Sequence, residues 1–382
     1  MKDVAILTKY YKNYNYGGML QGYALHKVII DMGFSCDIIA YDVNANANPV
    51  YPSIVQQCKQ YGFKAAVEKV MEKAVGKLKY LIKDTLSERK KLFDQFQKDV
   101  DADSKLYSDE TLSELNDQYY AFISGSDQVW NPNAVRLLYL QGFVQDNKKK
   151  IAYAASIGRS SFSEHEAEVL IPFIDRFDFL GIREKTGKQL LERYVHQNVS
   201  NVIDPTLLLS EEEWADVAVP RIVEGKYSLY YFFSNSYEIR KKTAEFCANH
   251  GLKMVLIPYA KQEFNFDDRK GECLRMNAVG PREFLSLIKH ASFVFTDSFH
   301  GAVFSIIHNK QFVVFERNKK GHVSMNSRLY DLLDGLELSD RMIYDTESIE
   351  SLEKIDYVKV QQKKINLQKV SREFLKSALK ES

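Results

Sequence analysis

The sequence predicts an α/β protein made of two doubly wound parallel-sheet domains, and three observations support this prediction. The chain has 382 residues, which is more than one ordinary domain of ~100 to 200 residues contains. Short apolar runs alternate with helical patterns in each half, in the order typical of βαβ units. The alternation starts again after Asp204-Pro205, because a proline can continue neither a helix nor a central strand.

The first half begins as strand, helix and strand. Residues 3–8 (DVAILT) predict the first strand, and apolar residues between Met19 and Ile29 predict a helix that ends at Gly33. Further strands are predicted at 35–42, 119–124, 149–156 and 177–183. We therefore expect a Rossmann-like N-terminal domain over residues 1–206.

The second half repeats the pattern. Strands are predicted at 227–233, 253–258, 292–296 and 311–316, with helices at about 237–250, at 280–291 and after residue 297. We expect a Rossmann-like C-terminal domain over residues 207–345. The charged tail, residues 346–382, predicts a helix that packs back on the N-terminal domain.

A basic segment interrupts the first domain at about residues 50–105. It has an apolar stripe at helical spacing, and Gln60 to Val100 contains ten Lys/Arg against six Asp/Glu. Such a segment either docks on the body as a helix pair or contacts a membrane surface or an anionic lipid-linked substrate.

Bulk properties exclude several classes of protein. Lys and Arg total 52 against 51 Asp and Glu, so there is no overall field that would favour nucleic acid. The first residues lack the long apolar run of a signal peptide or a membrane span. We expect a cytoplasmic protein, either free or peripheral at the inner face of the membrane. The four cysteines are scattered without metal-ligand spacing, so we expect no metal and no disulfide framework.

Polar residues gather where the strands of the first half end. In a parallel sheet these ends share one edge, which is where ligands bind. The candidates for substrate binding, besides Arg183, are Asn15, Gly17, Gly18, Gly125, Ser126, Asp127 and Ser156. The glycine pair could equally form a plain turn, and Ser126 or Asp127 could cap a helix. Arg183 either pairs with Glu184 or binds a carboxylate or phosphate.

The segment TDSFHG brings reactive groups to a strand end in the second half. His300 is expected in the first turn of a helix, whose free N–H groups and dipole favour an anion. That dipole disfavours imidazolium, so His300 needs an anionic neighbour to act as an acid, and a bound phosphate or carboxylate would supply it. Asp297 or Ser298 could cap the helix. Arg328, at the start of a later helix, is a second candidate for anion binding or a surface ion pair.

Seven sequence blocks together resemble the polysaccharide pyruvyl transferase family. The blocks are YNYGGMLQGYAL, FISGSDQVWNP, AYAASIG, GIREKTG, VIDPTLLL, TDSFHGAVFSI and NSRLYDLL. They extend from about residue 3 to 335 and leave out the basic segment and the tail. The resemblance implies a GT-B-like architecture, with two Rossmann-type domains facing each other across a cleft.

The resemblance also implies an activity. Members transfer the pyruvyl group of phosphoenolpyruvate, without a further cofactor, to a sugar of a bacterial surface polysaccharide such as a capsule, or to its lipid-linked precursor. The family's catalytic His falls on His300, and its donor-binding Arg falls on Arg183. The family position before the His, whose backbone contacts the donor, falls on Phe299. Many relatives carry Arg-Leu before this His, where this chain has Ser298 and Phe299, so the resemblance does not imply a side-chain contact at position 298.

Other functions share some of these features. A GT-B glycosyltransferase with a nucleotide-sugar donor would have the same fold, but no carboxylate placed for the ribose hydroxyls follows YYFF or MVLIP. A non-enzymatic envelope-binding module would leave Arg183 and His300 without a role. A dinucleotide enzyme would carry GxGxxG after a first strand, and this sequence does not.

Overall fold

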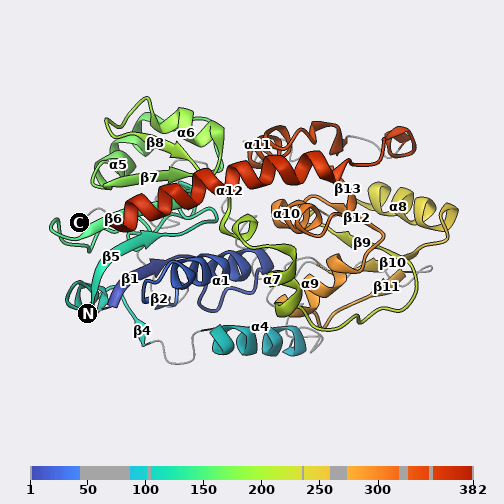
Figure 1. Cartoon of the computed structure of the whole chain (residues 1–382), viewed down its shortest axis with the longest axis horizontal. Coiled ribbons are helices and arrows are strands. Elements are labelled where there is room, and N and C mark those ends of the chain that lie inside the picture. The colour runs from blue at the N-terminus through green and yellow to red at the C-terminus, as the bar shows by residue number, and fades with distance from the viewer. Residues whose placement is uncertain are drawn as a thin grey trace, which may run out of the picture.

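A computed structural model describes residues 2–43, 87–100, 105–234, 236–258, 273–317, 326–343 and 347–380. Within these residues the chain forms two six-stranded sheets and a small two-stranded one. The two large sheets lie side by side, one in each half of the molecule (Figure 1). Most of the basic segment, including its apolar stripe, lies outside the described residues.

The N-terminal sheet has the strand order β2-β1-β5-β6-β7-β8, and its paired strands are parallel. Its strands are β1 (Lys2–Leu7), β2 (Cys36–Ile38), β5 (Tyr119–Ser124), β6 (Lys149–Ala155), β7 (Phe179–Ile182) and β8 (Val199–Asn201). Its α-helices are α1 (Tyr16–Asp31), α5 (Glu164–Ile174) and α6 (Lys185–Leu191). Strands β3 (Ala40–Tyr41) and β4 (Leu106–Tyr107) form the small sheet. Residues Val4–Leu7 are all buried, as expected of a strand covered on both faces.

The C-terminal sheet has the strand order β11-β10-β9-β12-β13-β14, again with parallel pairs. Its strands are β9 (Tyr227–Tyr231), β10 (Lys253–Leu256), β11 (Cys273–Arg275), β12 (Phe293–Thr296), β13 (Gln311–Phe315) and β14 (Met342–Ile343). Its α-helices are α7 (Glu211–Val217), α8 (Tyr237–Asn249), α9 (Pro281–Lys289), α10 (Phe299–Ile307) and α11 (Ser327–Gly335). The doubly wound α/β fold class predicted from the sequence is confirmed.

The strand order reverses at one place in each sheet, and this place locates the ligand edge. In the N-terminal sheet the reversal lies between β1 and β5, and in the C-terminal sheet it lies between β9 and β12. Loops that leave the two central strands there diverge to opposite faces and open a crevice. The segments after β1, β5, β9 and β12 therefore line the expected binding region.

Apolar contacts join the two halves. The first residue of α1, Tyr16, stacks on Phe284 of α9 with ring centroids 4.3 Å apart and an interplanar angle of 6°. Its hydroxyl donates a hydrogen bond of 2.9 Å to the Val279 carbonyl. Tyr16 is buried and belongs to a hydrophobic cluster that includes residues from both halves. The two domains therefore share this cluster, while each also has a cluster of its own.

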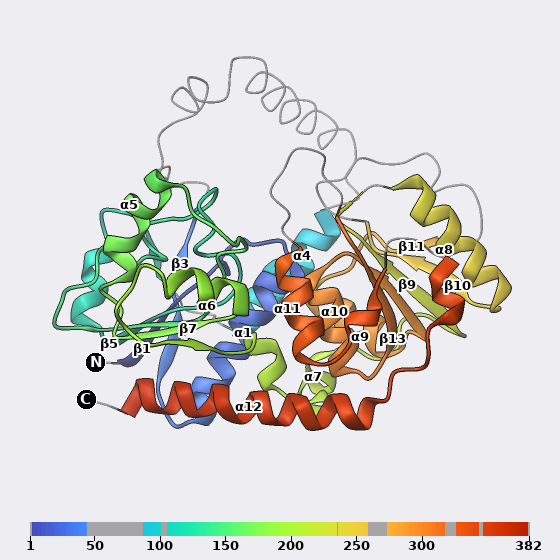
Figure 2. The same ribbon diagram turned by 90° about the horizontal axis from the view of Figure 1, so that it is seen from above.

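Two further helices connect the domains. Helix α12 (Tyr357–Lys380) runs along both halves (Figures 1 and 2). Its Ser371 Oγ accepts a hydrogen bond from the Ile203 N–H, while Gln361 Nε2 donates to Asn309 Oδ1 of the C-terminal half. Helix α4 (Ser87–Val100), the described end of the basic segment, packs Phe93 against Tyr16. No helix in the described ranges is long and apolar enough to cross a membrane.

The segment after β5 differs from one expectation. Ser126 and Asp127 do not cap a helix, because the residues that follow form turns. Asp127 instead makes an isolated parallel bridge to Ala155 with φ at +69°. This link to β6, far along the chain, fixes the loop in a conformation that local capping preferences do not predict.

Candidate active site

The start of α10 places His300 at the boundary between the domains. Ser298 is the N-cap, and its hydroxyl accepts a hydrogen bond of 3.3 Å from the Gly301 N–H. The Thr296 hydroxyl accepts from the Ser298 N–H at 3.0 Å and donates to the Tyr231 carbonyl at 2.6 Å. The first turn of a helix has no intrahelical acceptor for its N–H groups, so those of Phe299 and His300 remain available to an anion.

Close packing against α1 holds the imidazole in place. A Cβ built on Gly17 would overlap the His300 ring. Only glycine leaves room there, because it has no side chain. Gly17 therefore lets the N-terminus of α1 approach the catalytic candidate of the other domain.

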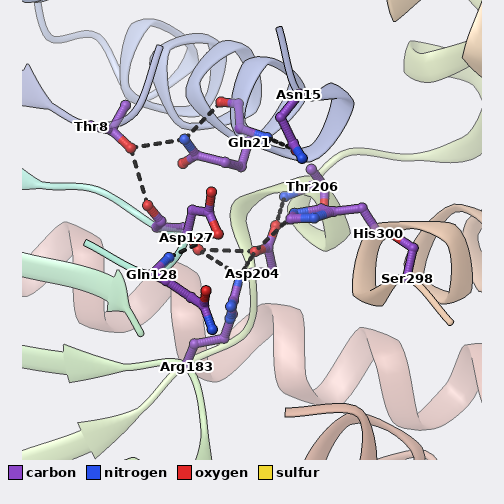
Figure 3. A network of polar contacts seen from close by, with 12 residues as sticks. Thr8, Asn15, Gln21, Asp127, Gln128, Arg183, Asp204, Thr206, Ser298 and His300 are labelled. Atoms are coloured by element: carbon purple, nitrogen blue, oxygen red, sulfur yellow. Dashed lines mark hydrogen bonds and ion pairs between the residues drawn. The ribbon is translucent and has the colours of Figure 1, made fainter. Parts of the chain in front are cut away.

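A single carboxylate connects the two principal candidates. Oδ2 of Asp204 lies 2.7 Å from Arg183 Nη1 and 3.6 Å from His300 Nε2. The same oxygen accepts a hydrogen bond of 2.9 Å from Ser126 Oγ, while Oδ1 accepts from the Thr206 hydroxyl at 2.7 Å. Figure 3 shows the side chains of Arg183 and His300 pointing toward Asp204 from different elements. Residues from both domains thus converge on one buried carboxylate.

The electrostatics of this group keep Asp204 ionised. Burial alone raises the pKa of a carboxyl group, but His300 and Arg183 outweigh this and hold the pKa of Asp204 well below its usual range. Burial also opposes the charge of Arg183, yet Glu184 and Asp204 raise the pKa of its guanidinium above the ordinary value. The anionic neighbour that His300 requires at a helix N-terminus is therefore a residue of the protein itself.

Asp127 adds a second carboxylate. Its Oδ1 accepts a hydrogen bond of 2.8 Å from the Gln128 N–H. Burial raises the pKa of this carboxyl group, but Lys9, His300 and Arg183 together lower it below the usual value. A positive φ at a non-glycine residue is uncommon, and such backbone is enriched at functional sites.

Phe299 holds two guanidinium groups close to its ring. Cζ of Arg183 lies 4.2 Å from the ring centroid, and Cζ of Arg328 lies 6.0 Å from it. Burial, together with Arg317 and Arg183, lowers the pKa of Arg328 to about 10. Asn326 occupies the N-cap of α11, but its side chain makes no cap hydrogen bond.

Three further predicted residues make hydrogen bonds within the protein. Asn15 caps α1 by accepting from the Gly18 N–H at 3.1 Å, and Gly125 donates its N–H to the Leu7 carbonyl at 3.0 Å. Both carboxylate oxygens of Asp297 accept backbone N–H groups, from Phe233 at 2.7 Å and Ser234 at 2.8 Å. Asn15 thus caps a helix, and Asp297 holds the backbone that follows β9.

Several buried polar atoms in this region lack a hydrogen-bond partner among the described residues, including Arg183 Nη2, Ser156 Oγ, Glu184 Oε2 and His300 Nε2. Buried donors normally form hydrogen bonds. A donor without a partner at the ligand edge, such as Arg183 Nη2, could therefore bind an acceptor atom of a ligand. No cluster of three or more metal-ligating side chains occurs in the described part of the chain.

Comparison with known protein families shows to which family the chain belongs. A family model described as polysaccharide pyruvyl transferase matches residues 15–319. The chain belongs to this family. The match begins at the N-cap of α1 and includes His300, Arg183 and Asp204. Comparison with curated protein sequences gave no match.

A solved structure similar to this polysaccharide pyruvyl transferase family member supports its GT-B fold, and a second one is less similar. UDP-GlcNAc 2-epimerase from Neisseria meningitidis, bound to UDP-GlcNAc, aligns over 100% of both chains with 10% identity and a TM-score of 0.55. A putative UDP-N-acetylglucosamine 2-epimerase from Listeria monocytogenes aligns with 8% identity and a TM-score of 0.49, covering 95% of this chain and 94% of that one. At such identities the similarity concerns the fold alone.

Sequence reasoning missed two residues of the site. Asp204 was expected only as a domain hinge, although it precedes a proline at a strand end where its carboxylate could face the crevice. Lys9 was passed over, although it lies two residues beyond the end of β1, at the point where the strand order reverses. Its position just after an apolar run was the available signal.

Proposed function

We propose that the protein transfers the pyruvyl group of phosphoenolpyruvate to two hydroxyls of a sugar in a bacterial surface polysaccharide or its lipid-linked precursor. The products are a pyruvate ketal and inorganic phosphate. The observation that carries this proposal is the convergence of His300 and Arg183, from separate domains, on the same oxygen of Asp204. Membership of the polysaccharide pyruvyl transferase family supports it.

The donor carries a carboxylate and a phosphate, so its site needs cations and N–H donors. Arg183 contributes Nη2, the donor left without a partner. The N-terminus of α10 contributes the N–H groups of Phe299 and His300. These groups are fixed before the donor arrives, which is the arrangement that stabilises developing charge most effectively.

The reaction requires one proton to reach the enol carbon of the donor. His300 is the candidate acid, because its ring lies beside the ionised Asp204 at the domain boundary. Protonation of C3 leaves a cation at C2, which the first sugar hydroxyl attacks. The C2–O bond to phosphate then breaks, the second hydroxyl attacks C2, and the ketal closes.

The protons balance in this sequence. Two hydroxyl protons are released; one replaces the proton that His300 gave to C3, and the other leaves with the phosphate. Asp204 and Asp127 near the imidazole have lowered pKa values, so they stay ionised while the second proton leaves with the phosphate. The chemistry thus uses groups that the chain itself supplies.

Phosphate release tests the proposal. The protein is incubated with phosphoenolpyruvate and a panel of glycan acceptors, both free and lipid-linked, and inorganic phosphate is measured. We expect acceptor-dependent phosphate release and a product mass increased by a pyruvate ketal.

Thermal shift provides a parallel measurement that needs no acceptor. A ligand at 100 times its dissociation constant adds about 2.7 kcal/mol of stability, so phosphoenolpyruvate should raise the melting temperature. Stabilisation by a nucleotide sugar alone, without phosphate release from any acceptor, would contradict the proposal in favour of a glycosyltransferase.

A further inference from the structure

The charge of Arg183 is already compensated within the protein. Its Nε donates to Glu184 at 3.1 Å and its Nη1 to Asp204 at 2.7 Å. These two carboxylates raise the pKa of the guanidinium. Arg183 therefore adds little net positive charge to the site. A donor with a carboxylate and a phosphate requires further cations.

The positive charge of Lys9 is compensated much less by the protein than that of Arg183. Its Nζ donates one hydrogen bond, to the Gln128 carbonyl at 2.6 Å. An ammonium group has three donors, and the remaining two have no hydrogen-bond partner among the described residues. No carboxylate oxygen in the same part of the chain lies within 4.0 Å of Nζ.

One carboxylate and three guanidinium groups act on the ammonium of Lys9. Burial lowers the pKa of its ammonium, and Asp127 opposes this effect. The guanidinium groups of Arg328, Arg136 and Arg183 all lower it further. An ammonium that loses solvent and faces several cations is stabilised by an anion that comes from outside the chain.

The backbone of Lys9 is held firmly at the ligand edge. The Asn13 side-chain amide donates to the Lys9 carbonyl at 2.6 Å. A Cβ built on Gly18 would overlap that amide, so the second glycine of the pair makes room for this anchor as the first makes room for His300. Lys9 and Asp127 follow β1 and β5, the two strands between which the order of the N-terminal sheet reverses.

We propose that Lys9 binds the phosphate group of the donor. This inference rests on the proposed function for the identity of the donor, and on the geometry of Lys9 for the site. A compact, strongly charged ammonium suits a phosphate dianion, whereas the planar guanidinium of Arg183 suits a carboxylate. Lys9 precedes the residues 15–319 that match the family model, so the match itself assigns it no role.

Lys9 would act by binding and charge neutralisation, without accepting or giving a proton. As the C2–O bond breaks, both bonding electrons remain on the phosphate oxygen. Two ammonium donors within hydrogen-bond distance of the phosphate oxygens stabilise that added charge. Arg328, whose guanidinium Cζ lies 6.0 Å from the centroid of the Phe299 ring, is a further cation from the C-terminal domain that acts on Lys9.

The test separates the two anionic halves of the donor. Inorganic phosphate and pyruvate are titrated separately into the wild-type protein and into Lys9→Met by calorimetry. We expect Lys9→Met to weaken phosphate binding by about 10- to 100-fold, the range for hydrogen bonds to a charged group. Pyruvate binding should change by less than about 2-fold. Lys241→Met, which removes an exposed ammonium on α8, serves as the matched control and should change neither.

A second variant guards against a folding defect. Lys9→Arg keeps the charge, so phosphate binding should stay within several-fold of the wild type, and melting temperatures of all variants are compared. The inference is wrong if Lys9→Met binds phosphate as the wild type does, if it loses pyruvate instead, or if Lys9→Arg loses phosphate as completely as Lys9→Met. Failure of wild-type protein to use phosphoenolpyruvate would overturn the proposed function while phosphate titration still decides the role of Lys9.

Discussion

The two sheets share a topology but bring different chemistry to the site between them. The N-terminal sheet contributes charged side chains from loops: Lys9, Asp127, Arg183 and Asp204 follow β1, β5, β7 and β8. The C-terminal sheet contributes the N-terminus of α10 with His300, while its own strand-end acid, Asp297, is taken up by backbone N–H groups. One domain thus mainly contributes charged side chains, and the other contributes His300, the proposed proton donor.

This division predicts the largest effect for His300. We expect His300→Ala to lower turnover in the phosphate-release assay by about 10² to 10⁴, with little change in melting temperature. His308 at the other end of α10 is the matched control, since it lies 3.6 Å from Glu211 and away from Asp204. His308→Ala should keep turnover near the wild-type value. Equal losses of turnover in both variants would mean that His300 has no special role.

The next largest effect concerns stability at the N-terminal edge. Asp204→Ala leaves Arg183 buried with one carboxylate partner fewer, and removal of one partner of a buried pair costs about 3–5 kcal/mol. Urea unfolding measures this loss. Asp146→Ala is the control, because Asp146 pairs with Arg176 at a side-chain exposure of 90%, where such pairs contribute about 0–1 kcal/mol. Similar losses in both variants would refute a central role for Asp204.

The same residue predicts a dependence on acid. The pKa of Asp204 is lower in the folded protein than its usual value. Its contribution to stability is therefore complete above about pH 4 to 5, and is lost as the pH falls from the ordinary carboxyl value of about 3.9 toward the lower folded value. The stability of Asp204→Ala should fall less steeply over this acid range.

The boundary between the two sheets is tested by Gly17→Ala. The added methyl group would collide with the His300 ring, and a displacement of about 1 Å at a reacting group can cost about 10²-fold in rate. Gly335→Ala, in α11, meets no atom within 4 Å and should leave turnover unchanged. An active Gly17→Ala variant would show that the position of the imidazole is not critical.

The smallest effect concerns the aromatic contact between the domains. Tyr16→Phe keeps the stacking on Phe284 but removes the hydrogen bond to the Val279 carbonyl. We expect a loss of about 1 kcal/mol, measured by urea unfolding. Tyr194→Phe, at a residue that is 40% exposed, should change stability by less than about 0.5 kcal/mol. A neutral Tyr16→Phe would indicate that the ring alone joins the domains.

The strands could be predicted because a buried strand appears in the sequence as a short run of apolar residues. Runs such as those of β1, β9 and β12 are apolar throughout, as strands covered on both faces must be, and the polar residues at their ends mark the ligand edge. The fold class, the family and the position of His300 at the start of a helix all follow from such short-range patterns.

The rest of the site depends on contacts between distant segments. Asp127 takes a turn instead of a helix because it bridges to Ala155. Asp204 meets His300 only because the loop after β8 faces the start of α10 across the domain boundary. Lys9 is one lysine among many in the sequence, and its exceptional surroundings come from arginines of several separate elements. The local periodicity of the sequence does not predict these contacts between distant segments.

The shared core beneath Tyr16 has a consequence for how the molecule melts. Two separate domains with a polar boundary unfold one after the other, whereas halves that bury apolar surface in each other lose it together. Tyr16 of α1 stacks on Phe284 of α9, and α12 forms hydrogen bonds to both halves. The described structure should therefore unfold as a single cooperative unit, with both sheets unfolding in the same transition.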